Sequence, residues 1–147
     1  MHIFISFLLF TIIFSGCGNP GQPLHQKDPV RVEGNVLEGN QRIKDAFQRG
    51  QSHLWVEGEG EIIKILSDDN QGSRHQRFIL SLGDQTLLID HNIDVAPRLP
   101  DLKVGEKITF YGEYLWNEKG GMVHWTHHDP NYRQPGGWLL YQGQKYQ

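Results

Sequence analysis

The sequence predicts a mainly β domain that one short helix precedes. Three observations support this fold class. Glycine is abundant, at 17 residues, and aromatic residues make up 11% of the chain. Apolar and polar residues alternate in several short runs, as they do in half-buried strands, and clusters of Gly, Asn and Asp separate these runs. Long alanine- and leucine-rich runs are missing. This balance favours short strands and tight turns over a helical bundle.

Residues 1–16 predict a lipoprotein signal peptide that is not part of the fold. The apolar run IFISFLLFTIIF has the length of a signal-peptide core and is too short to span a bilayer. Ser15 and Gly16 then precede Cys17, the only cysteine, which matches the lipobox of bacterial lipoproteins, where the cysteine thiol receives a diacylglycerol. No Lys or Arg precedes the apolar run, so an ordinary secretory signal followed by a chance cysteine is the alternative.

The predicted organisation continues with a tether and a single domain. We expect residues 17–38 to form the lipidated cysteine and a flexible tether rich in Gly and Pro, and residues 39–147 to form one β domain. An exported protein of the cell envelope is expected, and Gly18 after the cysteine favours the outer membrane if the organism is a diderm. The formal net charge of −3 argues against nucleic acid as a partner, because such binding needs clustered Lys and Arg.

The segment NQRIKDAFQRG predicts the helix. Asn40 is placed to cap its first turn, and Gly50 stands where a helix often ends. Ile43, Ala46 and Phe47 share one apolar face. A helix this short persists only if that face docks on another surface.

The rest of the chain predicts strands. Their expected ranges are 53–66, 77–82, 86–91, 107–116 and 122–127, followed by a terminal hairpin about Gln142-Gly143. In the first strand, Gly58 and Gly60 come just before a break in the alternation, which predicts a bend or a bulge. The short segment GDQ joins the second and third strands as a hairpin.

This order of a long bent strand, a hairpin, a long connection and a second hairpin resembles an OB-fold. We therefore predict an OB-fold-like five-stranded antiparallel barrel. Residues 92–106 occupy the position between strands three and four where such folds often carry a helix. A small antiparallel β-sandwich built from the same strands is the alternative.

Four blocks of sequence resemble one known family. They read GSRHQRFIL, QTLLIDHNIDVAPR, GEYLWNEKGGMVHWTHHDP and GGWLLYQGQKYQ. Together they are similar to the bacterial domain of unknown function 3465, over roughly Trp55 to Tyr146, and HWTHHDP is the most specific part. The resemblance implies small exported bacterial proteins without an established activity. It implies no catalytic residues.

The segment MVHWTHHDP carries the functional question. On a helix, His124, His127 and His128 would share one face and could chelate zinc. The segment follows a Gly-Gly turn, contains strand-forming residues and runs into Pro130, so we expect a strand instead. Four strand steps place His124 and His128 about 13 Å apart, which is too far for one ion. Alternation also predicts Val123 and Trp125 on the core face.

A composite metal site at the barrel rim remains open, with zinc as the expected ion. Its candidate ligands are His91, His127, His128 and Asp129. The simplest alternative is that these histidines only fix strand ends and loops through hydrogen bonds. Acid/base catalysis by His124, His127 and Asp129 is a third reading. It is weakened because the predicted domain has no cysteine, no GxSxG and no HExxH.

Other side chains could take part in ligand binding. The full candidate set is Arg77, His91, Asn92, Trp116, His124, Trp125, His127, His128 and Asp129. A further set of aromatic residues could stack on a sugar or a base, namely Tyr111, Tyr114, Trp116, Trp125, Tyr132 and Trp138. Glu57, Glu59 and Glu61 share one strand face, which we expect to face solvent.

Three functional hypotheses follow. The leading one is a membrane-anchored, non-enzymatic lipoprotein whose rim, rich in His and Trp, binds a small ligand, a metal or an envelope protein. The second is a metal-dependent hydrolase that uses the histidine cluster. The third is binding of an oligosaccharide or an oligonucleotide on the aromatic face of an OB-like barrel.

Overall fold

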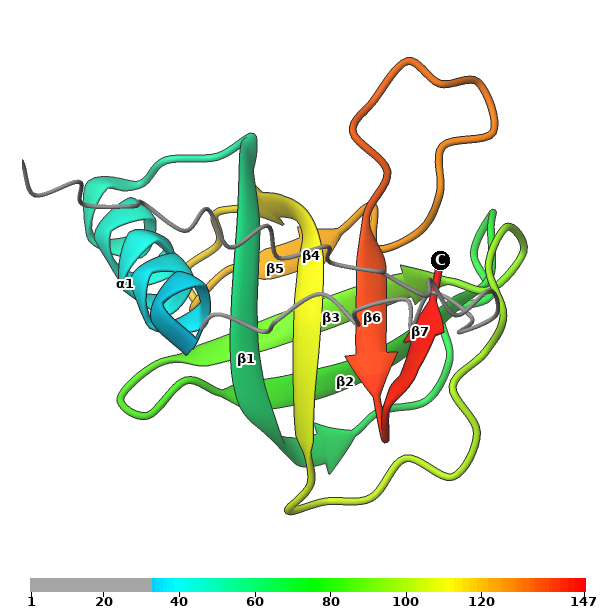
Figure 1. Ribbon diagram of the computed structural model, residues 1–147, viewed down its shortest axis with the longest axis horizontal. Helices are drawn as coiled ribbons and strands as arrows, with labels where there is room; N and C mark the ends of the chain where they lie inside the picture. Colours follow the sequence, from blue (N-terminus) through cyan, green and yellow to red (C-terminus); the bar gives the residue numbers. More distant parts are fainter. Residues whose placement is uncertain (1–32) are drawn as a thin grey trace, which may run out of the picture. The chain divides into compact units, whose positions relative to one another are not determined.

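The computed structural model describes residues 33–147, so the predicted signal peptide, Cys17 and most of the tether lie outside the described residues. One helix and seven strands follow each other along the chain (Figure 1). They are α1 (Glu33–Arg49), β1 (Leu54–Ile65), β2 (His75–Ser81), β3 (Thr86–Asn92), β4 (Lys107–Leu115), β5 (Met122–His124), β6 (Trp138–Tyr141) and β7 (Gln144–Tyr146). Within these residues no helix has the length and apolar character needed to cross a membrane.

Five of the strands close into a barrel. The sheet runs in the order β1-β2-β3-β5-β4, and β4 pairs back onto β1, while β6 and β7 extend the sheet beyond β4. The mainly β, OB-like barrel is therefore confirmed, and the sandwich is not formed. The prediction that the barrel is antiparallel throughout was wrong, because β3 and β5 run parallel. A closed ring with an odd number of strands cannot alternate in direction at every step, so at least one pair must be parallel.

β1 serves two neighbours because it is long and bulged. Its first part pairs with β4 from Leu54 to Glu61, and its last part pairs with β2. The register with β2 shifts between Ile62 and Lys64, which confirms the predicted irregularity. Gly58 is required for close packing, because a Cβ there would lie 2.6 Å from both the Phe110 ring and the Asn40 side chain.

Helix α1 begins earlier than the sequence predicted. It starts at Glu33, so residues 33–38 are helical and do not belong to a flexible tether. Asn40 is not the N-cap. Its side-chain nitrogen donates to the Glu59 carbonyl (2.8 Å) and its oxygen accepts from the Glu59 amide (3.1 Å). These two bonds satisfy the backbone amide and carbonyl of Glu59, at a position of β1 where the pairing with β2 has not yet begun.

The helix ends as predicted, at Gly50. This residue has a φ of +64°, and its amide donates to the Phe47 carbonyl while the Gln51 amide donates to the Ala46 carbonyl. That pair of bonds is the Schellman motif. It turns the chain sharply from α1 towards β1.

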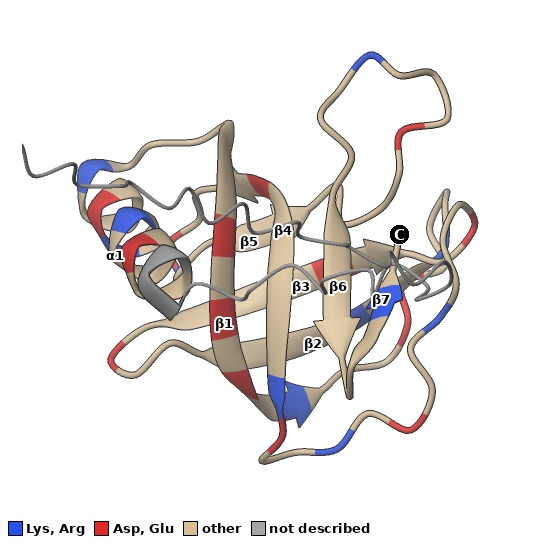
Figure 2. Ribbon diagram, viewed as in Figure 1, with Lys and Arg blue, Asp and Glu red and all other residues tan. Residues whose placement is uncertain are grey.

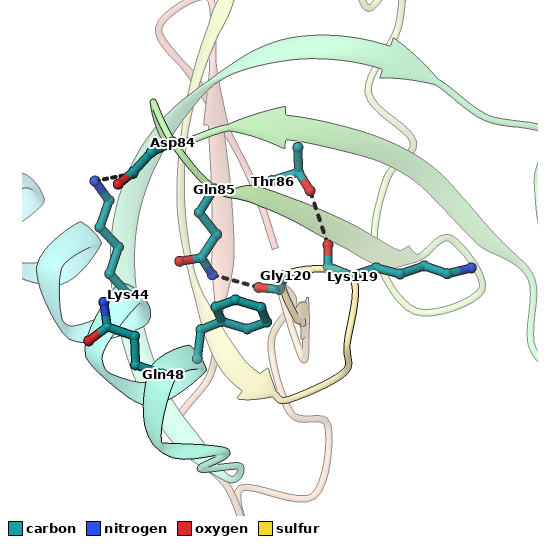
Figure 3. Close-up of a pocket in the computed structure, with 8 residues that line it drawn as sticks. Lys44, Gln48, Asp84, Gln85, Thr86, Lys119 and Gly120 are labelled. Atoms are coloured by element: carbon teal, nitrogen blue, oxygen red, sulfur yellow. Dashed lines mark hydrogen bonds and ion pairs between the residues drawn. The ribbon is translucent and has the colours of Figure 1, made fainter.

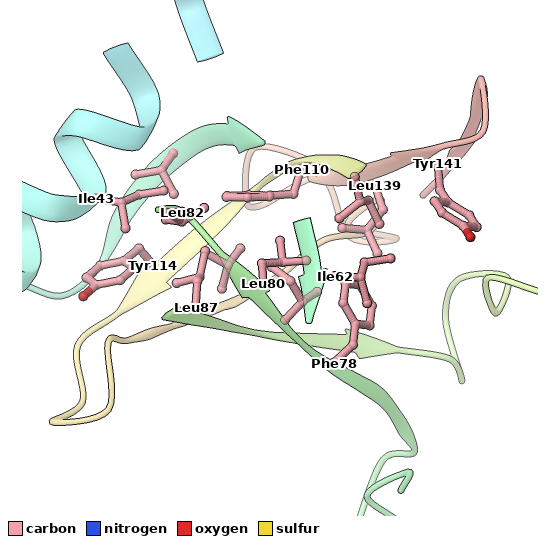
Figure 4. Close-up of a cluster of buried hydrophobic side chains, with 14 of the residues drawn as sticks. Ile43, Ile62, Phe78, Leu80, Leu82, Leu87, Phe110, Tyr114, Leu139 and Tyr141 are labelled. Atoms are coloured by element: carbon pink, nitrogen blue, oxygen red, sulfur yellow. The ribbon is translucent and has the colours of Figure 1, made fainter. Parts of the chain in front are cut away.

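The core fills the barrel and reaches the inner face of α1 (Figure 4). Ile43 and Ala46 supply the helix side, at 0% and 1% exposure. Tyr114 and Tyr141 are the largest fully buried side chains. Residues 93–106, between β3 and β4, contain turns but no helix. α1, which precedes the barrel, is thus the helix whose apolar face joins the barrel core.

Candidate functional site

A row of charged side chains crosses the outer face of the barrel from β2 to β4. Arg77 on β2 lies opposite Asp90 on β3, and Glu113 on β4 lies opposite His124 on β5. The parallel register of β3 and β5 pairs Leu88 with Met122 and continues to Asp90 and His124, whose charges interact. Basic and acidic groups therefore alternate along this row, on four adjacent strands.

Glu113 binds two histidines at one end of the row. His124 Nε2 lies 2.8 Å from one carboxylate oxygen, and His53 Nδ1 lies 2.9 Å from the other. Burial alone would raise the pKa of Glu113, but the hydrogen bonds from His53 and His124 outweigh burial and hold its pKa below the usual value. Because the carboxylate only accepts, both of these ring nitrogens carry the proton.

A cavity of about 330 Å³ opens beside Asp90, where β2 begins and where β3 and β5 end. We call it the histidine cavity. Its lining residues are Ser73, His75, Asp90, Asn92, Val95, His124, Trp125, His127, Asp129, Pro130 and Asn131. The volume lies within the range of small-molecule sites.

Asp90 is the unusual group of this cavity. Its Oδ1 atom is buried and has no hydrogen-bond partner among residues 33–147. Burial raises the pKa of Asp90, although the charges of His75 and Arg77 oppose that shift. Buried polar atoms are normally paired, so an unpaired acceptor on a residue that lines a cavity marks a candidate binding group.

The three cavity histidines each donate one N–H to an oxygen. His75 Nδ1 donates to the Ser73 carbonyl (2.8 Å), and His127 Nδ1 donates to the His128 carbonyl (2.8 Å), since a carbonyl can only accept. His124 donates to Glu113 in the same way. In each neutral ring the second nitrogen is then left as an acceptor.

The strand predicted over residues 122–127 is shorter than expected and does not include Trp125. β5 ends at His124, and Trp125 has a φ of +52°, which breaks the alternation that placed Trp125 in the core. Trp125 is half-buried and lines the cavity, with its ring 5.1 Å from the His127 ring. Thr126 is buried in its place, at 0% exposure.

His91 lies behind the cavity, with both nitrogens engaged. Nε2 donates to the Pro97 carbonyl (3.1 Å), and Nδ1 therefore accepts from the Thr126 hydroxyl (2.8 Å). His91 is fully buried, and burial lowers its pKa to about 4. It is a neutral structural histidine at neutral pH.

Asp129 organises the loop after β5. Its carboxylate accepts the backbone amides of Asn131 (2.9 Å), Arg133 (2.7 Å) and Gln134 (2.8 Å). The bond from Asn131 lowers the pKa of Asp129 most, against the opposing effect of burial. The carboxylate thus stabilises the loop that forms one wall of the cavity.

The expected metal ligands do not converge. His128 is exposed and its ring contacts Tyr132 at 5.0 Å, while His91 and Asp129 are engaged as described. Within residues 33–147 no three His, Cys, Asp or Glu side chains form a group that could hold a metal ion. The zinc site stays a prediction from the sequence.

The structure brings together about half of the ligand-binding candidates. Asn92, His124, Trp125, His127 and Asp129 line the histidine cavity. The remaining four, Arg77, His91, Trp116 and His128, do not line it.

Two of these outlying side chains have other partners. Arg77 donates to the Ser67 carbonyl (3.1 Å), and Trp116 Nε1 donates to the Phe47 carbonyl near the end of α1 (3.0 Å). The sequence places Asp90 next to His91 and His75 at the start of the second strand, but neither belongs to the predicted ligand-binding set. Alternation in β3 could have found Asp90, because an inward His91 requires an outward Asp90.

An aromatic row lies elsewhere on the outer face. Trp55 and Tyr111 have ring centroids 5.5 Å apart, and Tyr111 and Trp138 lie 6.2 Å apart. Lys145 Nζ lies 4.9 Å from the Trp138 ring. Figure 2 shows acidic residues along β1. They alternate with buried residues of that strand, as Trp55 does, so they share this outer side of the barrel.

Only part of the expected aromatic set forms this row. Tyr111 and Trp138 belong to it, while Tyr114 lies in the core and Tyr132 is 82% exposed on the loop after β5. Trp116 and Trp125 have the separate positions described above.

A second cavity of about 330 Å³ lies between α1 and two turns of the barrel (Figure 3). We call it the helix seam. Lys44 on α1 pairs with Asp84 (2.5 Å). Gln85 Nε2 donates to the Gly120 carbonyl (2.6 Å), and the Thr86 hydroxyl donates to the Lys119 carbonyl (3.0 Å). These groups satisfy one another across the seam.

Comparison with known proteins agrees with the resemblance found in the sequence. No curated protein matches the chain. The family model described as "Protein of unknown function (DUF3465)" matches residues 31–147, which include the barrel, the helix and the histidine cavity. The chain therefore belongs to the DUF3465 family.

Proposed function

We propose that the chain is a lipid-anchored protein of the bacterial cell envelope whose barrel binds a small ligand in the histidine cavity without catalysing a reaction. One observation carries the binding role, namely the buried Asp90 Oδ1 that has no partner among residues 33–147. Leaving a buried acceptor unpaired costs about 1–3 kcal/mol. A ligand that donates a hydrogen bond to this atom would recover that free energy.

The anchor rests on the sequence before the described residues. The apolar run, the small residues Ser15 and Gly16 and the single Cys17 support export and lipidation, and Gly18 favours the outer membrane in a diderm. The segment between Cys17 and α1 would then hold the domain at the membrane surface.

Binding is favoured over catalysis by how the candidate catalytic groups are used. Asp129 holds three backbone amides of its own loop. His124 already donates to Glu113, and His127 donates to a backbone carbonyl. These contacts fix side chains around a cavity, and no nucleophile with a catalytic sequence signature accompanies them.

The binding role can be tested with a filled cavity. Val95 lines the cavity and is 47% exposed, so Val95→Trp should occupy the space and leave the core intact. The full chain, purified in mild detergent, is screened by thermal shift and calorimetry with small cationic, anionic and neutral probes and with zinc. We expect at least one class to bind the wild type and to lose affinity in Val95→Trp. Equal behaviour of the two proteins towards every class would refute a ligand site here.

The anchor has its own test. Cys17→Ser should move the protein out of the membrane fraction, because the thiol that would carry the lipid is gone. Membrane fractionation of the wild type and the variant measures this. A membrane pool of wild-type size in Cys17→Ser would show that lipidation of Cys17 does not hold the protein there.

The aromatic row supports a second candidate, the binding of a neutral oligosaccharide. Trp55, Tyr111 and Trp138 offer neighbouring ring faces across three strands. The glutamates of β1, which alternate with its buried residues as Trp55 does, disfavour a phosphate backbone on this side. Titration with chitotetraose should quench tryptophan fluorescence in the wild type and not in Trp138→Ala. An unchanged wild-type signal would remove this candidate.

A further inference from the structure

We propose that the histidine cavity selects an organic cation that carries several N–H donors, an ammonium or a guanidinium, over neutral and anionic molecules of the same size. This inference rests on the proposed function, because it names the ligand class of the same cavity. It follows from the donors, the charges and the ring surface that line the cavity.

The titratable side chains of the cavity offer acceptors to a ligand, although the lining also holds donors, on Ser73, Asn92, Trp125 and Asn131. Asp90 Oδ1 is an acceptor without a partner. Each of the three lining histidines has one ring nitrogen engaged with an oxygen, so His75 Nε2, His124 Nδ1 and His127 Nε2 are the nitrogens that remain for a ligand, and each accepts when its ring carries a single proton. A ligand that brings several N–H groups can pair with these acceptors, whereas a carboxylate or a phosphate would place a second negative charge beside Asp90.

The charges of the cavity point the same way. Two carboxylates, Asp90 and Asp129, belong to the lining, and no Lys or Arg does. Asp129 is engaged with three backbone amides, so Asp90 is the carboxylate left to pair with a ligand. Arg77 is next to Asp90 on the outer face, but its guanidinium donates to the Ser67 carbonyl and lies 3.7 Å from Asp69. A cation could therefore pair directly with Asp90, which no Lys or Arg of the lining does.

An aromatic wall completes the arrangement. Trp125 lines the cavity, and its ring stacks near the His127 ring at an interplanar angle of 33°. Tryptophan is the best aromatic partner for a cation, and a flat guanidinium can stack on its face. The left-handed backbone at Trp125 is what turns this ring out of the core.

A metal ion is the competing occupant. Metal-bound histidines commonly donate their second N–H to an oxygen, as the three cavity histidines do. However, no three acidic, histidine or cysteine side chains among residues 33–147 form a metal-binding group. An organic cation, which spans several ångströms, does not require its acceptors to converge on one point.

The test compares probes of matched size by calorimetry on the full chain in detergent. Butylguanidinium and putrescine are the cations, 1,4-butanediol is neutral, butyrate is the anion, and zinc chloride is the metal. We expect the two cations to bind at least about tenfold more tightly than butanediol, with butyrate weaker still, because charge-assisted hydrogen bonds exceed neutral ones. Asp90→Asn should weaken cation binding by about tenfold or more.

Matched variants guard against a folding artefact. Asp84→Asn makes the same change in the helix seam and should leave cation affinity unchanged. Trp125→Leu should weaken butylguanidinium more than putrescine, because only the guanidinium presents a flat face. This second variant keeps the proposal testable if Asp90→Asn does not fold.

The possible failures are distinguishable. If butanediol or butyrate binds as tightly as the cations and Val95→Trp abolishes it, the cavity is a binding site but the cation assignment is wrong. Stoichiometric zinc binding lost in Asp90→Asn would also overturn the cation assignment. If Val95→Trp and the wild type respond equally to every probe, both the inference and the proposed function fail.

Discussion

The histidine cavity and the helix seam have the same volume, about 330 Å³ each, but they differ in how their polar groups are satisfied. In the seam, Lys44 pairs with Asp84. The side chains of Gln85 and Thr86 donate to backbone carbonyls of the turn before β5. In the cavity, a buried carboxylate oxygen has no partner. The two regions therefore differ in their unpaired buried polar atoms and not in their volume.

The difference also assigns different roles to the two regions. The contacts of the seam join α1 and the turn before β5 to the β2–β3 hairpin, so the seam contributes to the stability of the barrel (Figure 3). Asp90 contributes an unfavourable term to stability in the absence of a ligand. Mutations should therefore act on stability in the seam and on binding in the cavity.

The largest expected effect is at the seam. Gly120 has a φ of +113°, and a Cβ there would lie 2.0 Å from the Thr86 carbonyl oxygen. Gly120→Ala should lower the free energy of unfolding by about 3 kcal/mol, because the seam must open to admit the methyl group. Urea denaturation measures this. Gly143→Ala is the control, since Gly143 also has a positive φ, +79°, but meets no atom within 4 Å. Equal losses in the two variants would show that strain alone, and not the seam contact, is responsible.

A smaller effect concerns pH and belongs to the cavity side. The pKa of His91 is lowered to about 4 in the folded state, so between about pH 6.5 and 4 the unfolded chain binds a proton that the folded chain does not. Stability should therefore fall as the pH drops through this window, by roughly 2 kcal/mol between pH 7 and pH 5.

His91→Gln is the matched variant for this pH effect. Glutamine can keep one bond to the Pro97 carbonyl and one from Thr126, but it does not titrate. Urea denaturation at pH 7 and pH 5 should show a smaller loss in the variant than in the wild type. The same loss in both proteins would mean that His91 is not the buried neutral group that carries the effect.

The smallest effect contrasts the two aspartates. Because burial raises the pKa of Asp90, ionisation of this group costs free energy in the folded state at neutral pH. Asp90→Asn should therefore raise stability by up to about 1 kcal/mol while it weakens cation binding by about tenfold or more. Asp84→Asn should produce no stabilisation, because Asp84 is exposed and paired with Lys44. Thermal unfolding measures both. A loss of stability in Asp90→Asn would indicate that Asp90 is a structural group.

Local signals in the sequence predicted most of the fold. The turns at Gly50 and at Gln142-Gly143 form where expected, because glycine there adopts a positive φ, and Gln142 joins it at +49°. The alternation of buried and exposed residues in β2 and β3, and the GDQ hairpin between these strands, were also predicted, because both depend on residues close in sequence.

The predictions from the sequence were wrong where the conformation or the partner of a residue depends on residues far away in the chain. Asn40 resembles a helix cap, but its amide binds the backbone of Glu59, 19 residues away. Trp125 favours a strand by residue type, and nothing local reveals that its backbone becomes left-handed. That single residue changes which side chains face the core, so the full lining of the cavity could not be predicted from the sequence.

The odd number of strands in the barrel has a consequence for its mechanics. In a closed barrel of five strands, the strand direction cannot alternate at every pairing, so at least one pair is parallel. Here it is the pair formed by β3 and the three-residue β5. Parallel pairing is slightly less stable per residue than antiparallel pairing. We therefore expect local opening of the barrel to begin at this short β3–β5 pairing. The histidine cavity lies where that pairing ends. A molecule held between Asp90 on β3 and His124 on β5 would link these two strands and oppose the opening of the barrel between them.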